Sequence, residues 1–241
     1  VVQMISAPQQ QLQQQDDNNS SSSERLHLVL FLVFIILTSI FNAFAYTGGP
    51  WPLGYIGLGN CSIGYSGLGD LFVFLYFGLV ATLMPPFLYL TLSAQEQQQD
   101  TTNEGWPYLY SVLSKLLPYA VQVAVLATNI IVVNNLRDRH TDVLSNKRTL
   151  AVRLGPTFCR LEYLANILIA YGLVLWEAFL VDTQITASKM IPLLSFPLAF
   201  KEWKAICQKE GSDLNRHVGG AAMVQFLFCI LLATSVRIAA S

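Results

Sequence analysis

The sequence predicts an all-α membrane protein, a polytopic bundle of about six transmembrane helices. Of its 241 residues, 53% are hydrophobic and only 12% are charged, whereas soluble proteins carry about 25% charged residues. Several apolar runs approach the roughly 20 residues that a helix needs to cross a bilayer. Lys and Arg gather in the segments between these runs, as they do on the cytoplasmic side of membrane proteins. With a net charge of -1 and no basic patch interleaved with aromatic residues, the chain gives no sign of nucleic-acid binding.

Six apolar segments are candidates for transmembrane helices. They are residues 28–46, 71–92, 108–136, 158–181, 187–206 and 218–238. The fifth is the weakest, because Pro192 and Pro197 interrupt it. Pro85 and Pro86 predict a break in the second, since each proline removes one backbone hydrogen bond of a helix.

The N-terminal segment differs from the rest of the chain. Residues 9–23 consist almost entirely of Gln, Asp, Asn and Ser, a composition that cannot bury enough apolar surface to fold. We therefore expect residues 1–25 to be a disordered low-complexity segment and residues 26–241 to form the bundle. A second polar tract, residues 95–104, links the second and third apolar segments.

The distribution of Lys and Arg predicts the orientation of the bundle. Six spans place most of these residues on one side of the membrane, which is typical of a cytoplasmic face. They are Arg137, Arg139, Lys147, Arg148, Arg153, Arg160, Lys201, Lys204, Lys209 and Arg216. A chain that crosses the membrane six times in this way also has residues 47–70 and residues 134–142 on that side. Both segments are therefore expected to face the same compartment.

Residues 134–142, Asn-Asn-Leu-Arg-Asp-Arg-His-Thr-Asp, lie where the third apolar segment meets water. On a helix, Asp138 and Asp142 share one face at a separation of about 6 Å, and they repel each other unless a cation lies between them. Mg²⁺ commonly binds one or two carboxylates together with substrate phosphates, and neighbouring Arg and Lys complement phosphate charge. This pattern predicts a magnesium-dependent site for a lipid diphosphate. Taken alone, Arg137, Arg139, Lys147 and Arg148 are also consistent with ordinary anchors on the positive side.

A short internal repeat lies in the loop between the first two apolar segments. Residues 54–60, Gly-Tyr-Ile-Gly-Leu-Gly-Asn, recur as residues 64–70, Gly-Tyr-Ser-Gly-Leu-Gly-Asp. Glycines at this density permit a close approach of the backbone and can present N–H groups to an anion. The alternative is a flexible surface turn.

The third apolar segment also carries Gln122, Thr128 and Asn129. Amide and hydroxyl groups are costly to bury in hydrocarbon unless each has a hydrogen-bond partner. A structural interpretation is that these groups join neighbouring helices.

The motifs together resemble the UbiA-type intramembrane prenyltransferases, and within them the 1,4-dihydroxy-2-naphthoate prenyltransferases of menaquinone and phylloquinone biosynthesis. The resemblance rests on four stretches, which are residues 45–50 with 52–55, residues 67–74 continuing to 77–78, residues 134–142 with 147–155, and the stretch from Leu214-Asn215 onward. Its most specific part is the acidic motif followed by Lys-Arg-Thr-Leu-Ala-Val-Arg-Leu-Gly at residues 147–155. It extends from about Leu28 to the C-terminus.

The resemblance implies a bundle of nine helices around a central cavity, of which this chain corresponds to the last six. The N-terminal helices, with a first Asp-rich motif, are then missing. The implied activity is the Mg²⁺-dependent transfer of a prenyl or phytyl group from its diphosphate to an aromatic acceptor, dihydroxynaphthoate in this branch. Homogentisate or hydroxybenzoate stays open as the acceptor. The alternative function is a truncated, non-catalytic membrane subunit that keeps the fold and binds lipid or quinone.

The resemblance also implies roles for single residues. Asp138 and Asp142 are expected to hold Mg²⁺, with support from Asn134 or Asn135. The cations expected to neutralise the departing diphosphate are Arg137, Lys147 and Arg148. Tyr55 or Tyr65 is expected near the diphosphate or the acceptor, and Asp70 as a polar anchor or proton acceptor. A protein of this kind is integral and multi-pass, in a plastid membrane if eukaryotic and otherwise in a bacterial inner membrane.

Overall fold

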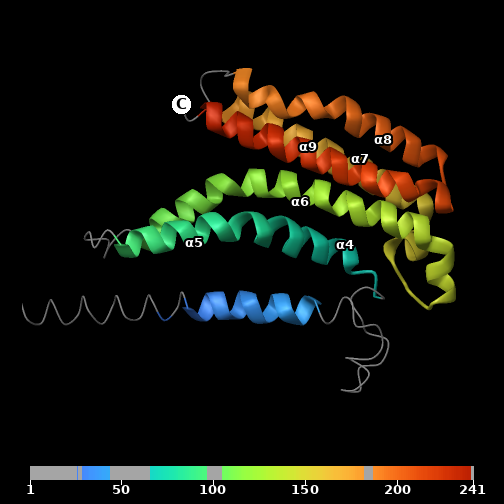
Figure 1. Ribbon diagram of the computed structural model, residues 1–241, viewed down its shortest axis with the longest axis horizontal. Coiled ribbons are helices and arrows are strands. Elements are labelled where there is room, and N and C mark those ends of the chain that lie inside the picture. The colour runs from blue at the N-terminus through green and yellow to red at the C-terminus, as the bar shows by residue number, and fades with distance from the viewer. Residues whose placement is uncertain (1–25, 27–28, 44–65, 97–104, 182–186, 240–241) are drawn as a thin grey trace, which may run out of the picture.

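The computed structural model describes residues 26, 29–43, 66–96, 105–181 and 187–239, and every regular element in these ranges is helical (Figure 1). The predicted all-α class is therefore confirmed. A helix at Val29–Ala43 precedes the labelled elements. These are α4 (Gly69–Phe72), the π-helix η1 (Val73–Val80), α5 (Ala81–Glu96), α6 (Gly105–Leu144), α7 (Leu150–Trp176), the π-helix η2 (Glu177–Val181), the 3-10 helix η3 (Ala187–Ser195), α8 (Phe196–Gln208), the 3-10 helix η4 (Gly211–Leu214) and α9 (Asn215–Ala239).

Within the described ranges, four helices are long and apolar enough to cross a membrane. They are Gly69–Leu90, Tyr110–Leu144, Leu150–Phe179 and Gly211–Ala239. The helix Val29–Ala43 is apolar but shorter. These helices confirm the prediction of an integral, multi-pass membrane protein. The low-complexity segment at residues 1–25 and most of the tract at residues 95–104 lie outside the described residues.

The prolines affect the helices in two different ways. Pro85 and Pro86 lie inside α5, and the helix continues through them, so the predicted break at this place is wrong. The fifth predicted span, by contrast, is divided into η3, which contains Pro192, and α8, which has Pro197 in its first turn. A proline is tolerated in the first turn of a helix because the N–H groups there have no partner within the helix. Pro197 is therefore compatible with the start of α8 at Phe196.

Helix α6 lies at the centre of the bundle, between α4 and α5 on one side and α7 and α9 on the other (Figure 1). It presents small side chains, Ala120, Ala124 and Ala127, all of which are buried. Small residues at helical spacing let helices approach closely in a membrane, where packing rather than water drives their association. On the facing η1, Gly78 is so close to α6 that a side chain there would meet the Cα and Cβ atoms of Ala124.

Aromatic side chains hold the other layer together. The Tyr171 ring of α7 meets the Phe228 ring of α9 edge-on at 5.4 Å and the Phe196 ring of α8 at 5.1 Å. Its hydroxyl lies 2.8 Å from Ser195 Oγ at the end of η3. Edge-to-face contacts of this kind stabilise by about 0.5–1.5 kcal/mol beyond area burial. A single tyrosine thus fixes α7, α8 and α9 against one another.

All three polar residues of the third apolar segment are buried. Thr128 Oγ1 donates to Ala124 O within α6 at 2.9 Å. Asn129 Nδ2 donates to Tyr163 O at 3.3 Å, and Asn129 Oδ1 accepts from Asn166 Nδ2 at 2.9 Å. The prediction that these groups join helices is confirmed for Asn129, which links α6 to α7. The Gln122 side chain is completely buried and lies beside Glu177, where α7 passes into η2.

Asn129→Leu is expected to destabilise the bundle by about 1–2 kcal/mol, the range of interhelical hydrogen bonds in membranes. The substitution leaves Asn166 Nδ2 and Tyr163 O without the partner that each has in the structure. Reversible unfolding in detergent measures the change, and a double-mutant cycle with Asn166→Leu separates the coupling from the two single effects. Additive effects of the two substitutions would show that the pair contributes nothing.

Candidate functional site

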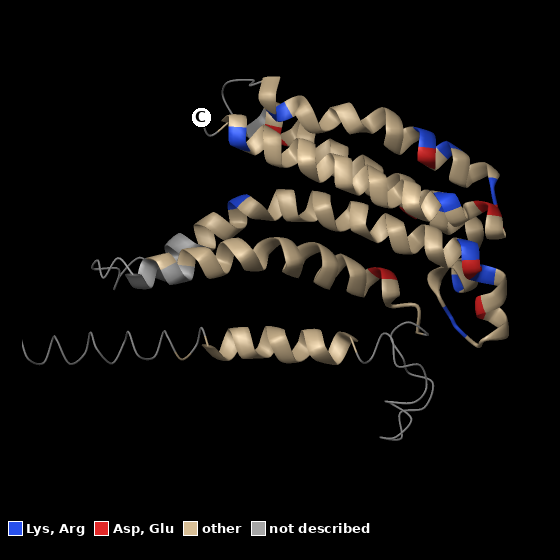
Figure 2. Ribbon diagram, in the orientation of Figure 1, with Lys and Arg blue, Asp and Glu red and all other residues tan. Residues whose placement is uncertain are grey.

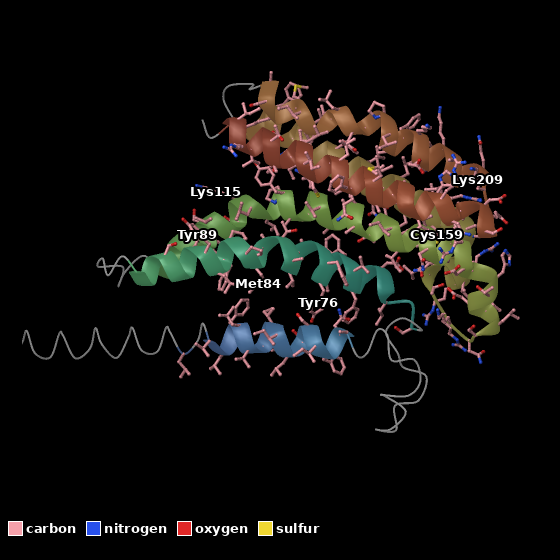
Figure 3. All side chains as sticks on the ribbon, viewed as in Figure 1. Tyr76, Met84, Tyr89, Lys115, Cys159 and Lys209 are labelled. Carbon is pink, nitrogen blue, oxygen red and sulfur yellow. The ribbon has the colours of Figure 1, made fainter. Side chains whose placement is uncertain are left out.

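The acidic motif occupies the last turns of α6, which runs without interruption to Leu144. The span from Tyr110 to Leu144 has 35 residues, about 52 Å of helix against a hydrocarbon core of about 30 Å. Its ends must therefore extend beyond the core. Figure 2 shows acidic and basic residues gathered at the end of the bundle where α6 ends and α7 begins. Lys209 lies at this end and Lys115 at the other (Figure 3).

Asp138 is held by a forked pair with its neighbour Arg137. Arg137 Nε donates to Asp138 Oδ1 at 2.7 Å, and Arg137 Nη2 donates to Asp138 Oδ2 at 2.6 Å. The same Nη2 donates to Asn134 Oδ1 at 2.8 Å. Bidentate pairs of this kind are among the stronger ion pairs and fix the plane of the carboxylate. Arg137 thus joins Asn134 and Asp138, which lie one turn apart on α6.

Asp142, one turn further on, has a different environment. Its side chain is 7% exposed, against 34% for Asp138. Lys147 Nζ lies 3.4 Å from Asp142 Oδ1, and Lys147 N donates to Asp142 O at 2.9 Å. The turn after α6 therefore folds Lys147 back onto the helix. Each of the two predicted metal ligands has a cation at its side.

Asn135 connects the motif to the N-terminal part of the described chain. Its Nδ2 donates to Asp70 Oδ1 at 3.3 Å and to Oδ2 at 3.4 Å. Both side chains are buried. The sequence predicted that the glycine-rich loop and the acidic motif face the same compartment, and the contact places Asp70, at the end of that loop, beside the motif.

Gly67 brings the same loop against the turn between α6 and α7. It has φ of +83°, and a Cβ atom there would lie 2.6 Å from Arg148 O and 3.3 Å from Arg153 Nε. Arg153 Nε in turn donates to Arg148 O at 2.9 Å. Only glycine adopts this backbone conformation at little cost while allowing so close an approach. The sequence resemblance included Gly67, but this contact explains why a glycine is required.

Gly67→Ala is expected to destabilise the protein by about 1–3 kcal/mol, the cost of a strained left-handed backbone. Thermal unfolding in detergent measures the effect, and faster proteolysis at Lys147 and Arg148 is expected to accompany it. Gly219→Ala is the matched control, because a Cβ atom at this position of α9 meets nothing within 4 Å. Equal stability of the two variants would contradict the argument.

The sequence did not predict a second ionic network at this end. Glu210 follows α8 and forms two ion pairs. Its Oε1 lies 3.4 Å from Arg160 Nη2 of α7, and its Oε2 lies 4.0 Å from Arg139 Nη2 of α6. Arg160 also donates to Ile206 O at 3.2 Å and to Lys209 O at 3.1 Å. Nothing in the spacing of these residues indicated the contacts, because they join segments that are about 50 to 70 positions apart. They hold the ends of three helices together beside the motif.

The remaining predicted site residues are not brought together. The Arg148 side chain is exposed, and its carbonyl rather than its guanidinium makes the contacts described above. Tyr55 and Tyr65 lie outside the described residues. Within the described ranges, no group of three or more His, Cys, Asp or Glu side chains is arranged to hold a metal ion by itself. Two carboxylates one turn apart still match the number that Mg²⁺ uses when substrate phosphates supply further ligands.

The fold and this charged end define a multi-pass helical membrane protein with an acidic motif at the membrane surface. The chain is 31% identical over 211 residues to the 1,4-dihydroxy-2-naphthoate octaprenyltransferase of Mycobacterium leprae. The aligned residues make up 87% of this chain and 60% of that protein. It is 31% identical over 209 residues to UbiA prenyltransferase domain-containing protein 1 of Danio rerio, which covers 84% of this chain and 51% of that protein. The chain belongs to the UbiA prenyltransferase family.

A third relative is the 1,4-dihydroxy-2-naphthoate octaprenyltransferase of Haemophilus influenzae, with 28% identity over 84% of this chain and 56% of that protein. The chain thus spans little more than half the length of these curated relatives. No family model matches the chain, and no solved structure matches it.

Proposed function

We propose that the protein transfers a prenyl or phytyl group from a prenyl diphosphate to an aromatic acceptor, 1,4-dihydroxy-2-naphthoate, in the biosynthesis of menaquinone or phylloquinone. Family membership and the activity for which the bacterial relatives are named support this proposal. The observation that carries it is the placement of Asp138 and Asp142 one turn apart at the charged end of α6, each beside a cation.

In this proposal, Asp138 and Asp142 hold Mg²⁺, which supplies positive charge to the diphosphate when bound. Arg137 and Lys147 add fixed positive charge where negative charge accumulates as the diphosphate departs. In the structure, Arg137 donates hydrogen bonds to both carboxylate oxygens of Asp138. When substrate and Mg²⁺ bind, Arg137 must therefore release Asp138 or share its carboxylate with the metal ion. The guanidinium then becomes available to a phosphate oxygen at the same place.

The transfer itself needs little covalent chemistry from the protein. The C–O bond of the prenyl diphosphate breaks, and its electron pair leaves with the diphosphate. The electron-rich ring of the acceptor attacks the allylic cation and forms a C–C bond. In dihydroxynaphthoate the carboxylate of the attacked carbon leaves as CO₂, and its electron pair restores the aromatic ring. The chain's part is to position both substrates and exclude water.

Removal of divalent metal is expected to abolish the transfer of a labelled prenyl group to dihydroxynaphthoate by membranes that contain the natural protein. The physical reason is that two carboxylates without Mg²⁺ repel a diphosphate. Product formation is measured after EDTA treatment and again after MgCl₂ is added back, with restoration expected. Full activity in EDTA would contradict the magnesium assignment. Absence of transfer under every condition would favour the alternative, a non-catalytic membrane subunit.

A further inference from the structure

A buried histidine joins α8 to α9 at the charged end of the bundle. The side chain of His217, in the first turn of α9, is only 4% exposed. Its Nδ1 lies 2.6 Å from Glu202 Oε2 of α8, and its Nε2 lies 2.9 Å from Lys209 Nζ. Gly220, further along α9, makes this contact possible, because a Cβ atom there would meet the Glu202 carboxylate. The two ring nitrogens of His217 thus hold α8 and the residue after it against α9.

The partners of His217 fix where its protons lie. A lysine ammonium can only donate hydrogen bonds, and lysine is a much stronger base than histidine. His217 Nε2 must therefore accept from Lys209. The single ring proton then lies on Nδ1, which donates to the Glu202 carboxylate, and the ring is neutral. A second proton can bind only at Nε2, so Lys209 and a proton compete for the same nitrogen.

The other charged or titratable side chains near this contact come from every element around α9, and they have other partners or are exposed. They are Arg139 of α6 and Arg160 of α7, which pair with Glu210; Tyr163 of α7, on which the Glu202 charge acts; Cys207 of α8, on which the Arg160 charge acts; Lys189 of η3, whose charge acts on Glu177; and the exposed residues Lys201 and Lys204 of α8, Asp213 of η4 and Arg216 of α9. Among the described residues, Glu202 and Lys209 are the charged groups that bond to the ring.

Lys209 also begins the connection between α8 and α9, which consists of Lys209, Glu210 and η4. Arg160 Nη2 of α7 donates to Lys209 O at 3.1 Å, and Glu210 forms the ion pairs with α6 and α7 described above. Gly211 follows with φ of +56°, a conformation that glycine adopts at little cost. The bond from Lys209 to His217 therefore orients the residues that tie this connection to the neighbouring helices.

We propose that His217, Glu202 and Lys209 form a pH-sensitive latch on the connection between α8 and α9. At the alkaline end of the range in which histidine titrates, about pH 5–8, neutral His217 accepts from Lys209 and the latch is closed. When Nε2 takes up a proton, it can no longer accept, and the imidazolium repels the ammonium while it keeps its bond to Glu202. Lys209 is then released.

The direction of the pH dependence follows from the protons bound in each state. The open latch binds one proton more than the closed latch, so the closed state is favoured as the pH rises and the open state as the pH falls. This inference does not rest on the proposed prenyl transfer, because none of the three residues belongs to the acidic motif.

¹⁵N NMR of the His217 ring in the natural protein tests the closed state. The ring signals are assigned by their absence in His217→Gln. At about pH 8, above the usual titration of histidine, we expect a proton on Nδ1 and none on Nε2. A proton on Nε2 at this pH would overturn the latch, because Lys209 could not then donate to that nitrogen.

Hydrogen exchange of residues 209–214 in bilayers, followed by mass spectrometry, tests the opening. The rates are corrected for the intrinsic dependence of amide exchange on pH. We expect corrected rates at least about tenfold higher at about pH 5.5 than at about pH 8, since uptake of one proton shifts an equilibrium by up to about tenfold per pH unit. Equal corrected rates at the two pH values would overturn the latch.

Three variants separate the latch from other effects of pH. Lys209→Met removes the donor and is expected to give fast exchange at both pH values. His217→Gln does not titrate and is expected to abolish the pH dependence. His140→Gln is the matched control, because His140 is exposed and lies 3.1 Å from Arg139 Nη2 in the neighbouring ionic network, and it is expected to keep the full pH dependence. A pH dependence that survives in His217→Gln, or one that disappears in His140→Gln, would overturn the proposal.

Discussion

Asp138→Ala is expected to lower prenyl transfer by about 10²- to 10³-fold, the range found when one preorganised electrostatic group is removed from an active site. The substitution removes one of two proposed Mg²⁺ ligands and also frees Arg137 from its forked pair. A freed guanidinium binds a diphosphate strongly in its ground state. We therefore expect kcat to fall more than the affinity for the prenyl diphosphate.

The measurement is the rate of prenyl transfer by membranes that contain equal amounts of folded protein. Asp213→Ala is the matched control, because Asp213 is an exposed carboxylate on η4 and is expected to leave the rate unchanged. Asp138→Asn keeps the shape of the side chain and tests charge alone. Undiminished transfer in Asp138→Ala would exclude Asp138 from the site, whereas an equal loss in Asp213→Ala would indicate a nonspecific effect.

Gly78→Leu is expected to have the largest effect on stability, a loss of at least about 3 kcal/mol, the upper end of the usual cost of overpacking. Gly78 of η1 is buried against α6, where a Cβ atom would meet the Cα and Cβ atoms of Ala124. Backbone atoms cannot rotate away as a flexible side chain can. The layer formed by α4, η1 and α5 must therefore move away from α6.

This displacement also reaches the candidate site, because the contact of Asp70 with Asn135 depends on the same packing. We expect Gly78→Leu to unfold at a lower temperature and to expose the chain between α5 and α6 to protease. Gly172→Leu is the matched control, since Gly172 of α7 is exposed and a Cβ atom there meets nothing within 4 Å. A melting temperature for Gly78→Leu equal to that of the control would contradict the close packing of Gly78 against Ala124.

The sequence predicted the helical class and the long apolar segments because both depend on local composition. It also placed Asp138 and Asp142 on one face, since a helix fixes the spacing of neighbours four residues apart. It was wrong about Pro85 and Pro86, whereas the interruption that it predicted at Pro192 and Pro197 is present in the structure. Helix α5 continues through Pro85 and Pro86, while Pro192 and Pro197 fall in a 3-10 helix and the start of α8. Whether a helix tolerates a proline depends on what surrounds it, and a single sequence does not contain this information.

Sequence alone determined that this chain is a multi-pass helical membrane protein with an acidic motif at the water boundary. These properties follow from composition and from the fixed geometry of one helix. Only the tertiary structure decided that Asp70 meets Asn135, that Glu210 lies between Arg139 and Arg160, and that Asn129 joins α6 to α7. Each of these facts depends on which faces of separate helices meet, and that choice is made by packing over the whole bundle.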